Sequence, residues 1–137
     1  PFLWDTKEKD QQRTAWMKPK YNTDEEQDPL TVVKADTNSL YHYYRTFIRL
    51  RSNNDILALG DMEASTIKEK GTAAFYRVYE GKKLLIIHNL SDKKVEIPVN
   101  EELKTFSQKF FTTHPTNTIE GEHTHLQPYS TLILEKI

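Results

Sequence analysis

The clearest pattern of hydrophobic and polar positions lies in the segment TNSLYHYYRTFIRLRSNND, residues 37–55. Apolar side chains recur three, four, seven and eight residues after Leu40, which places them on one stripe along a helix. The stripe consists of Leu40, Tyr43, Tyr44, Phe47 and Ile48. This spacing predicts a helix over residues 39–53, with an apolar face that some other surface has to cover.

After this helix the hydrophobic period changes from about four residues to two. Residues 72–80 alternate imperfectly, EGKK at 80–83 has the composition of a tight hairpin turn, and KLLIIHNL that follows predicts a central strand. A third strand is predicted over 94–99, where Pro98 should mark its end or a sheet edge. Further strands are predicted near 61–67, 108–112 and 131–136. Strands at this spacing, with turns between them, predict a mainly β fold, an antiparallel sandwich.

The first third of the chain has neither period. Residues 1–38 are rich in charged and amide side chains, and we predict a long loop there. Trp4 and Trp16 are unusual in such a setting, because each needs an apolar surface to rest on. Two interpretations are open: both tryptophans pack on a neighbouring domain outside this chain, or they contact a sugar directly.

Composition and charge exclude several classes. With 19 basic and 20 acidic residues and no basic stripe, nothing indicates nucleic-acid binding. The chain has no cysteine, which excludes disulfides and thiolate metal sites. The longest apolar run, Leu84–Ile87, is too short to span a membrane. Because the sequence begins at Pro1 and has no signal peptide, we expect it to be a piece of a longer protein.

Two kinds of side-chain cluster could carry chemistry. His123 and His125, with His114 nearby, could share a face as metal ligands, but the segment TTHPTNTIEGEHTH around them is polar and predicts a surface loop with solvated histidines. The carboxylate pairs Glu25/Glu26, Glu101/Glu102 and Glu120/Glu122 could act as acid and base. Such work needs one carboxyl in an apolar setting, and all three pairs lie in polar stretches, so we predict solvated surfaces. The glycosylation pattern Asn89-Leu90-Ser91 is too short to carry a prediction.

Five segments in order resemble a known family. They are PFLWD, QQRTAWMKPKYNT, SLYHYYRTFIRLRSNNDILALG, FYRVYEGKKLLIIHNLSD and LQPYSTLIL. Together they resemble the C-terminal end of α-amylase-type glycoside hydrolases built on a (β/α)8 barrel, and most closely the starch-utilisation α-amylases of gut bacteria. The resemblance is clearest over residues 39–92, and residues 95–125 match no motif of the family.

The resemblance implies a division of the chain. Residues 1–55 correspond to the loop after the eighth barrel strand and the last barrel helix, and residues 56–137 to a C-terminal antiparallel Greek-key β-sandwich. PFLWD is similar to the rim of the substrate cleft, which makes Phe2, Trp4 and Asp5 substrate-binding residues in the intact parent. The family's catalytic carboxylates lie upstream, so we expect no catalytic residue, metal ligand or cofactor in this chain. The resemblance implies calcium binding in the parent through upstream residues, and a secreted or cell-surface location.

Three hypotheses of function follow. The first is a non-catalytic C-terminal part of an α-amylase-like hydrolase acting on starch or maltooligosaccharides, whose sandwich packs on its own barrel and stabilises it. A glycoside hydrolase activity then belongs to the parent and not to this chain. In isolation the helix stripe would favour self-association. The alternative is a carbohydrate-binding module that holds α-glucan through exposed aromatics. The third is an interaction domain unrelated to sugars.

Overall fold

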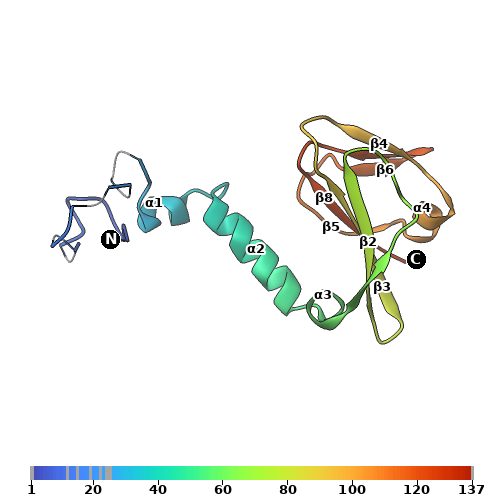
Figure 1. Cartoon of the computed structure of the whole chain (residues 1–137), viewed down its shortest axis with the longest axis horizontal. Coiled ribbons are helices and arrows are strands. Elements are labelled where there is room, and N and C mark those ends of the chain that lie inside the picture. Colours follow the sequence, from blue (N-terminus) through green and yellow to red (C-terminus); the bar gives the residue numbers. More distant parts are fainter. Residues whose placement is uncertain are drawn as a thin grey trace. The chain divides into compact units, whose positions relative to one another are not determined.

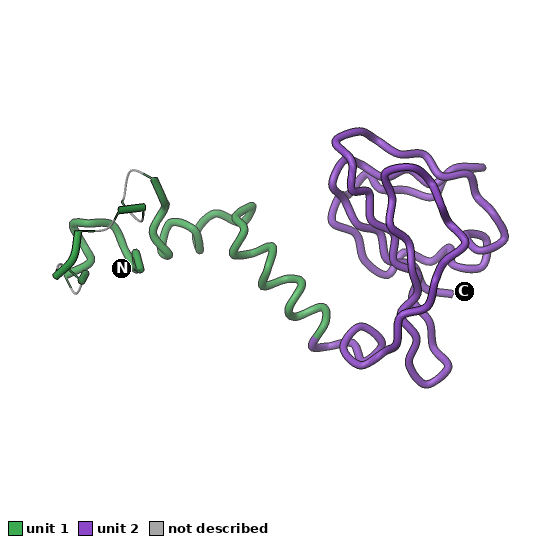
Figure 2. The backbone as a smooth tube through the Cα atoms, in the orientation of Figure 1, with its two compact units in different colours: residues 1–51 green, residues 52–137 purple. Residues whose placement is uncertain are grey.

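The chain divides into two compact units, Pro1–Arg51 and Ser52–Ile137 (Figure 2). The computed structural model describes residues 2–11, 13–14, 16–18, 20–21, 23 and 26–136. The domain boundary predicted from the sequence lies after Asp55, four residues beyond the limit of the first unit.

The first unit contains two helices, α1 (Leu30–Ala35) and α2 (Leu40–Ser52). Helix α2 confirms the helix predicted over 39–53, and none of its residues is buried within the structure. Helix α1 corrects the prediction of an uninterrupted loop over residues 1–38. It is too short to show an apolar period, and Pro29, with a φ of −68°, precedes it as its N-cap residue.

The second unit is a sandwich of two antiparallel sheets (Figure 1). Sheet A has the strand order β1-β2-β3-β8-β5, and sheet B the order β4-β7-β6. The strands of sheet A are β1 (Asp61–Ala64), β2 (Thr72–Tyr79), β3 (Lys82–Asn89), β8 (Thr131–Glu135) and β5 (Gln108–Thr112). Those of sheet B are β4 (Val95–Pro98), β7 (His123–Leu126) and β6 (Thr118–Glu120). Strands β3 and β8 are far apart in sequence but adjacent in sheet A, as Greek-key connections require.

Several strand predictions are confirmed in detail. Strand β3 is the central strand of sheet A, and β4 is an edge strand that ends at Pro98. The turn between β2 and β3 consists of Glu80 and Gly81, with φ values of 48° and 76°. Positive φ at both positions is the geometry of a type I′ turn, which suits the twist of a hairpin.

The prediction of a surface loop in this unit is wrong. The polar segment around His123 is not a surface loop, because it forms strands β6 and β7. Only Thr124 and Leu126 of β7 point into the core, while His123 and His125 point outward. An inner face of one threonine and one leucine gives too weak a hydrophobic alternation for the strand to be seen in the sequence.

The core lies between the two sheets. Its fully buried side chains come from β3, β8, β7 and the short helix α4 (Glu101–Thr105): Leu85, Ile87, Leu132, Leu134, Leu126 and Leu103. A further short helix, α3 (Asp55–Leu59), packs on β2 and β3. Gly60 lets α3 approach β2 closely, because a Cβ at this position would lie 2.4 Å from the carbonyl oxygen of Ile56 and 2.8 Å from that of Val78.

Both short helices are capped by asparagine. Asn54 accepts a hydrogen bond from the Leu57 amide, and Asn100 accepts one from the Leu103 amide, each at 3.0 Å. Five residues are too few for an apolar stripe, so the sequence pattern did not reveal these helices.

Candidate functional site

The predicted substrate-binding residues Phe2, Trp4 and Asp5 lie in one stretch of the first unit. The rings of Phe2 and Trp4 are 4.5 Å apart and tilted by 58°, and both side chains are more than half exposed. Leu3 between them is buried and its carbonyl accepts a hydrogen bond from the Leu30 amide at 2.9 Å. The segment is therefore fastened to the start of α1, with its two aromatic rings outward.

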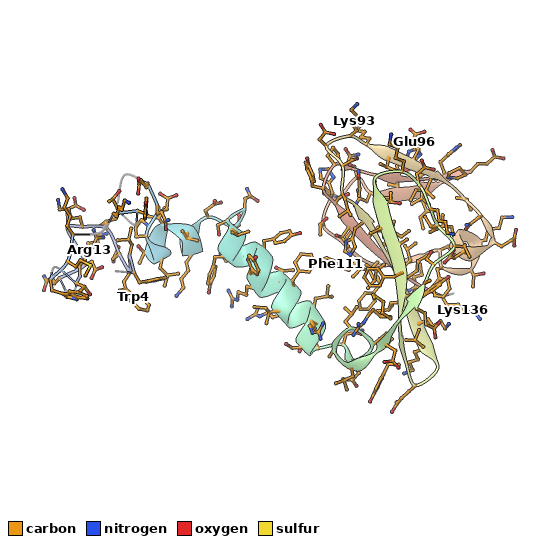
Figure 3. The ribbon with its side chains drawn as sticks, in the orientation of Figure 1. Trp4, Arg13, Lys93, Glu96, Phe111 and Lys136 are labelled. Atoms are coloured by element: carbon orange, nitrogen blue, oxygen red, sulfur yellow. The ribbon has the colours of Figure 1, made fainter. Side chains whose placement is uncertain are left out.

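Asp5 organises this segment rather than standing free in it. Its carboxylate accepts hydrogen bonds at 2.8 Å from the Thr31 hydroxyl and from the Thr6 amide, and these lower the pKa of Asp5 below its usual value. The Arg13 guanidinium, labelled with Trp4 in Figure 3, donates to the Asp5 carbonyl at 2.8 Å. A shallow depression of about 470 Å³ beside Trp4 is lined by Lys9, Asp10 and Gln11. The arrangement is an exposed aromatic pair on a braced segment, which can contact a ligand, and the lowered pKa of Asp5 makes its carboxyl unsuited to act as a general acid.

The helix stripe is an exposed apolar surface of the first unit. The exposed fractions of Leu40, Tyr44 and Ile48 are 68%, 60% and 62%. Tyr41, Tyr44 and Ile48 also line a depression of about 370 Å³, together with Arg45 and Arg49. A stripe this exposed is typical of a helix that is covered in a larger assembly.

The outer face of sheet A is a second apolar surface. Paired residues on neighbouring strands share a face, so Phe75, Ile86, Ile133 and Phe111 form one row across β2, β3, β8 and β5. Leu84 lies on the same face, and Figure 3 labels Phe111 on the sandwich. Because Leu85 and Ile87 fill the core on the other side, β3 is apolar on both faces. Such strands are typical of sheets covered on both sides.

His88 lies beside this row. Its Nδ1 is 2.8 Å from the Thr131 hydroxyl, and its ring centre is 5.7 Å from that of Phe75. Burial lowers the pKa of His88, so the neutral ring is favoured in the folded protein.

Two buried asparagines, whose structural role the sequence pattern does not predict, hold one end of the sandwich together. The Asn89 amide nitrogen donates to the carbonyls of Lys93 and Gln127 at 2.7 and 2.9 Å, and its oxygen accepts from the Ser91 amide at 2.9 Å. Asn117 accepts from the Gln127 amide at 2.8 Å and donates to the Thr112 hydroxyl at 3.0 Å. Asn89 is 1% exposed, so its side chain is a structural anchor and is inaccessible to glycosylation in the folded protein.

Of the three histidines that could share a face, two do so in the structure. His123 and His125 share the outer face of β7 with ring centres 6.2 Å apart, and His125 Nδ1 lies 3.4 Å from Glu96 Oε1. His114 lies elsewhere, where its Nδ1 is 2.9 Å from the Thr116 hydroxyl. Across the described residues, no three histidine, aspartate or glutamate side chains lie close enough to hold a metal ion.

The carboxylate pairs have three different settings. Glu25 lies outside the described residues, and Glu120 and Glu122 are exposed at the β6–β7 hairpin. Glu101 is exposed and pairs with Lys104 at 2.7 Å. Glu102 differs from the solvated side chain that we predicted, because it accepts hydrogen bonds from the Ser65 hydroxyl at 2.7 Å, from the Thr66 amide at 3.1 Å and from the Thr66 hydroxyl.

Glu102 is a latch between α4 and the segment after β1. Burial alone would raise the pKa of Glu102, but the hydrogen bonds from Thr66, Tyr76 and Ser65 outweigh it and lower the pKa below 4.5. Burial and the Glu102 contact raise the pKa of Tyr76. A general acid needs the opposite change in a carboxyl, so this group is structural.

We expect this latch to give the fold a pH dependence. A carboxylate with a lowered folded pKa stabilises the fold above its unfolded pKa, here about 4.5, and that contribution is lost as the pH falls through the lower folded value. At pH 7, Glu102→Gln should cost about 1 kcal/mol, the low end for hydrogen bonds to a partly exposed charged group. Urea unfolding of both proteins between pH 7 and 3 measures the difference, which should shrink below about pH 4.5.

The matched control for the latch is Glu101→Gln, which removes an exposed carboxylate next to Glu102 in sequence. It should leave the free energy of unfolding within about 0.5 kcal/mol of the original. A Glu102→Gln effect that stays constant down to pH 3 would show that the carboxylate charge has no part in the latch.

Comparison with known proteins shows which proteins this chain resembles. The family model "Alpha-amylase SusG C-terminal domain" matches residues 72–133. Alpha-amylase 3 of Dictyoglomus thermophilum is 27% identical over 135 residues, covering 98% of this chain and 26% of that protein. Alpha-amylase SusG of Bacteroides thetaiotaomicron is 31% identical over 78 residues, covering 52% of this chain and 11% of that protein. A crystal structure of the trehalulose synthase MutB matches with a TM-score of 0.73 at 19% identity, covering 98% of this chain and 25% of the other.

Together these matches support a C-terminal part of an α-amylase-type enzyme. Within that part, residues 72–133 are similar to the C-terminal domain of alpha-amylase SusG. The predicted fold class, an antiparallel sandwich preceded by the end of a catalytic barrel, is confirmed for the sandwich. The chain spans about a quarter or less of the curated relatives it matches. None of the helices in the described part has the length and hydrophobicity that crossing a membrane requires.

Proposed function

We propose that this chain is the non-catalytic C-terminal part of an enzyme that acts on starch or maltooligosaccharides, and that its sandwich packs on the catalytic barrel of the same polypeptide. The observation that carries the proposal is the outer face of sheet A. A two-sheet sandwich needs one apolar face per sheet, yet sheet A has two, with Ile86 and Leu85 on opposite sides of β3. Ile86 and Ile133 in the middle of the outer face are already buried, and a further layer of protein would complete the cover over Phe75 and Phe111 at its two sides.

The contribution of such packing is stability. Phe75 and Phe111 are half-buried, so a covering layer would remove the rest of both rings from water. In the same assembly the α2 stripe would face the barrel, and the Phe2–Trp4 segment would lie at the rim of its substrate cleft. The resemblance supports two additional proposals about the parent: it binds calcium through residues upstream of this chain, and it is secreted or held at the bacterial cell surface.

The carbohydrate-binding alternative, as a free-standing module, has less support. Such a module presents several coplanar aromatics on one accessible face. In the sandwich Phe75 and Phe111 share a face, but the row between them is buried, and Tyr76 points to the core where its ring lies 5.1 Å from that of Phe106. The described part of the sandwich therefore has no aromatic platform on either face.

The self-association of the isolated chain tests whether its apolar surfaces need a cover. At 16.1 kDa, we expect its weight-average mass in sedimentation equilibrium to rise with concentration, because the α2 stripe is exposed. The double variant Leu40→Ser/Ile48→Ser should lower the association constant by about tenfold or more, since it removes two large apolar contacts. Thr46→Ser, an exposed position on the same helix, is the matched control and should associate like the original chain. A monomer at every concentration would contradict the proposal that this stripe is an interior surface.

A further inference from the structure

His88 is an ionisable side chain set into the apolar outer face of sheet A. It shares that face of β3 with Ile86, and its direct neighbours across the sheet are Ala73 of β2 and Thr131 of β8. The imidazole is half-buried, and its centre lies 5.7 Å from the ring centre of Phe75. All four neighbours are uncharged, so the fold offers this ring apolar packing and a single hydroxyl.

The hydrogen bond of the ring suits its neutral form. His88 Nδ1 lies 2.8 Å from the Thr131 hydroxyl, which has no other hydrogen-bond partner among the described residues. Nδ1 of a neutral imidazole can accept the hydroxyl proton, whereas both nitrogens of an imidazolium are donors. Protonation of His88 therefore reverses the bond. It leaves the hydroxyl proton of Thr131, a residue that is 7% exposed, without an acceptor in the described structure.

No negative charge is placed to compensate an imidazolium at this position. His88 forms no ion pair with a carboxylate of the described residues, and burial is the cause of its lowered pKa. The ionisable side chains that β2, β3 and β8 place on the outer face are Arg77, Tyr79, Lys82 and Glu135, and β1 and β5 add none. Glu135 pairs with Leu84, which lies four residues, or about 13 Å, along β3 from His88. A carboxylate at that distance is largely screened by salt, because it is further away than a Debye length.

We propose that His88 makes the outer face of sheet A acid-sensitive, so that protonation of this one ring destabilises the folded sandwich. The unfolded chain takes up the proton first as the pH falls, because the pKa of His88 lies below 6.5 in the folded protein. The contribution of the neutral ring to stability is therefore complete above pH 6.5 and decreases as the pH falls from there to the folded pKa. A covering barrel would bury the ring further and enlarge the effect, and this last step alone rests on the proposed function.

Urea unfolding of the whole chain at pH 7.5 and at pH 5, followed by circular dichroism, tests the proposal. Between these values the Glu102 latch stays charged, because its effect begins below about pH 4.5. The variant His88→Asn cannot ionise, and its amide oxygen can still accept from the Thr131 hydroxyl. From pH 7.5 to 5 the unfolding equilibrium constant of the original chain should rise by about threefold or more beyond the rise in His88→Asn.

The matched control is His123→Asn, which removes an exposed histidine from the outer face of sheet B. This control should keep the full pH dependence of the original chain. All other titrating groups are common to the original chain and His88→Asn, so their effects cancel in the comparison. An equal rise in these two proteins, or an equal loss of the rise in His123→Asn, overturns the proposal.

Nuclear magnetic resonance of the original chain gives a measurement that does not depend on the folding of a variant. The nitrogen-15 shifts of the His88 ring should show Nδ1 without a proton at pH 7.5, and the ring should titrate below pH 6.5. A neutral ring with its proton on Nδ1, or a titration at or above pH 6.5, overturns the proposal. Neither result bears on the proposed packing against a barrel, which the mass of the chain tests.

Discussion

Replacing Asn89 with alanine is expected to destabilise the sandwich by about 3 kcal/mol, the largest effect of any polar substitution considered for this chain. The substitution leaves the amide of Ser91 without its partner and removes one of two donors from the carbonyls of Lys93 and Gln127, which still accept from the hydroxyls of Ser91 and Ser130. The unsatisfied amide costs about 1–3 kcal/mol, and each of the two lost hydrogen bonds adds about 0.5–1.5 kcal/mol. For a domain whose total stability is about 5–15 kcal/mol, this is a large fraction.

Urea unfolding followed by circular dichroism measures this effect. The matched control is Asn100→Ala, which removes a helix cap at the surface and should cost about 1 kcal/mol. Asn89→Asp should be at least as harmful as Asn89→Ala, because a carboxylate would face the carbonyl oxygens of Lys93 and Gln127 in a site that is 1% exposed. If Asn89→Ala costs no more than Asn100→Ala, the asparagine does not anchor the end of the sandwich.

The sequence predicts the parts of this fold that have strong periodicity. Helix α2 was predicted from its apolar stripe, and the β2–β3 hairpin from the EGKK turn and the nearly continuous apolar run KLLIIHNL of β3. Strands β6 and β7 were missed because only Thr124 and Leu126 of β7 face the core fully buried. Helices α3 and α4 are five residues long and were missed for lack of length.

The candidate sites, like the fold, include residues that the sequence predicts and residues that it does not. The Phe2–Trp4–Asp5 segment was predicted from its order among resembling motifs, and its role in substrate binding stays a prediction. The two asparagine anchors could not be predicted, because their partners lie up to 38 residues away and asparagine is also common in turns. The sequence does carry one signal for the outer face of sheet A. In KLLIIHN apolar and polar residues do not alternate, and a strand without this alternation is apolar on both faces.

The second large effect concerns catalysis, which we expect to be absent from the isolated chain. Retaining hydrolysis of a glycosidic bond needs a nucleophilic carboxylate and an acid about 5 Å apart on a rigid frame. In the described chain, Glu102 is held as a low-pKa latch and Asp5 as a brace for its own loop, so neither is poised as an acid. Barrel enzymes place such groups at the ends of barrel strands, and the described residues include two sheets and four helices but no barrel.

The measurement that tests the account most directly is a reducing-end assay of the purified chain with soluble starch and with maltoheptaose. Glycoside hydrolases accelerate this reaction by many orders of magnitude, so even a trace of intrinsic activity is detectable over hours. A full α-amylase serves as the positive control. The account predicts reducing ends at the level of a buffer blank for both substrates at every protein concentration. Release that rises in proportion to the chain, and persists after a further purification step, would contradict a non-catalytic C-terminal part.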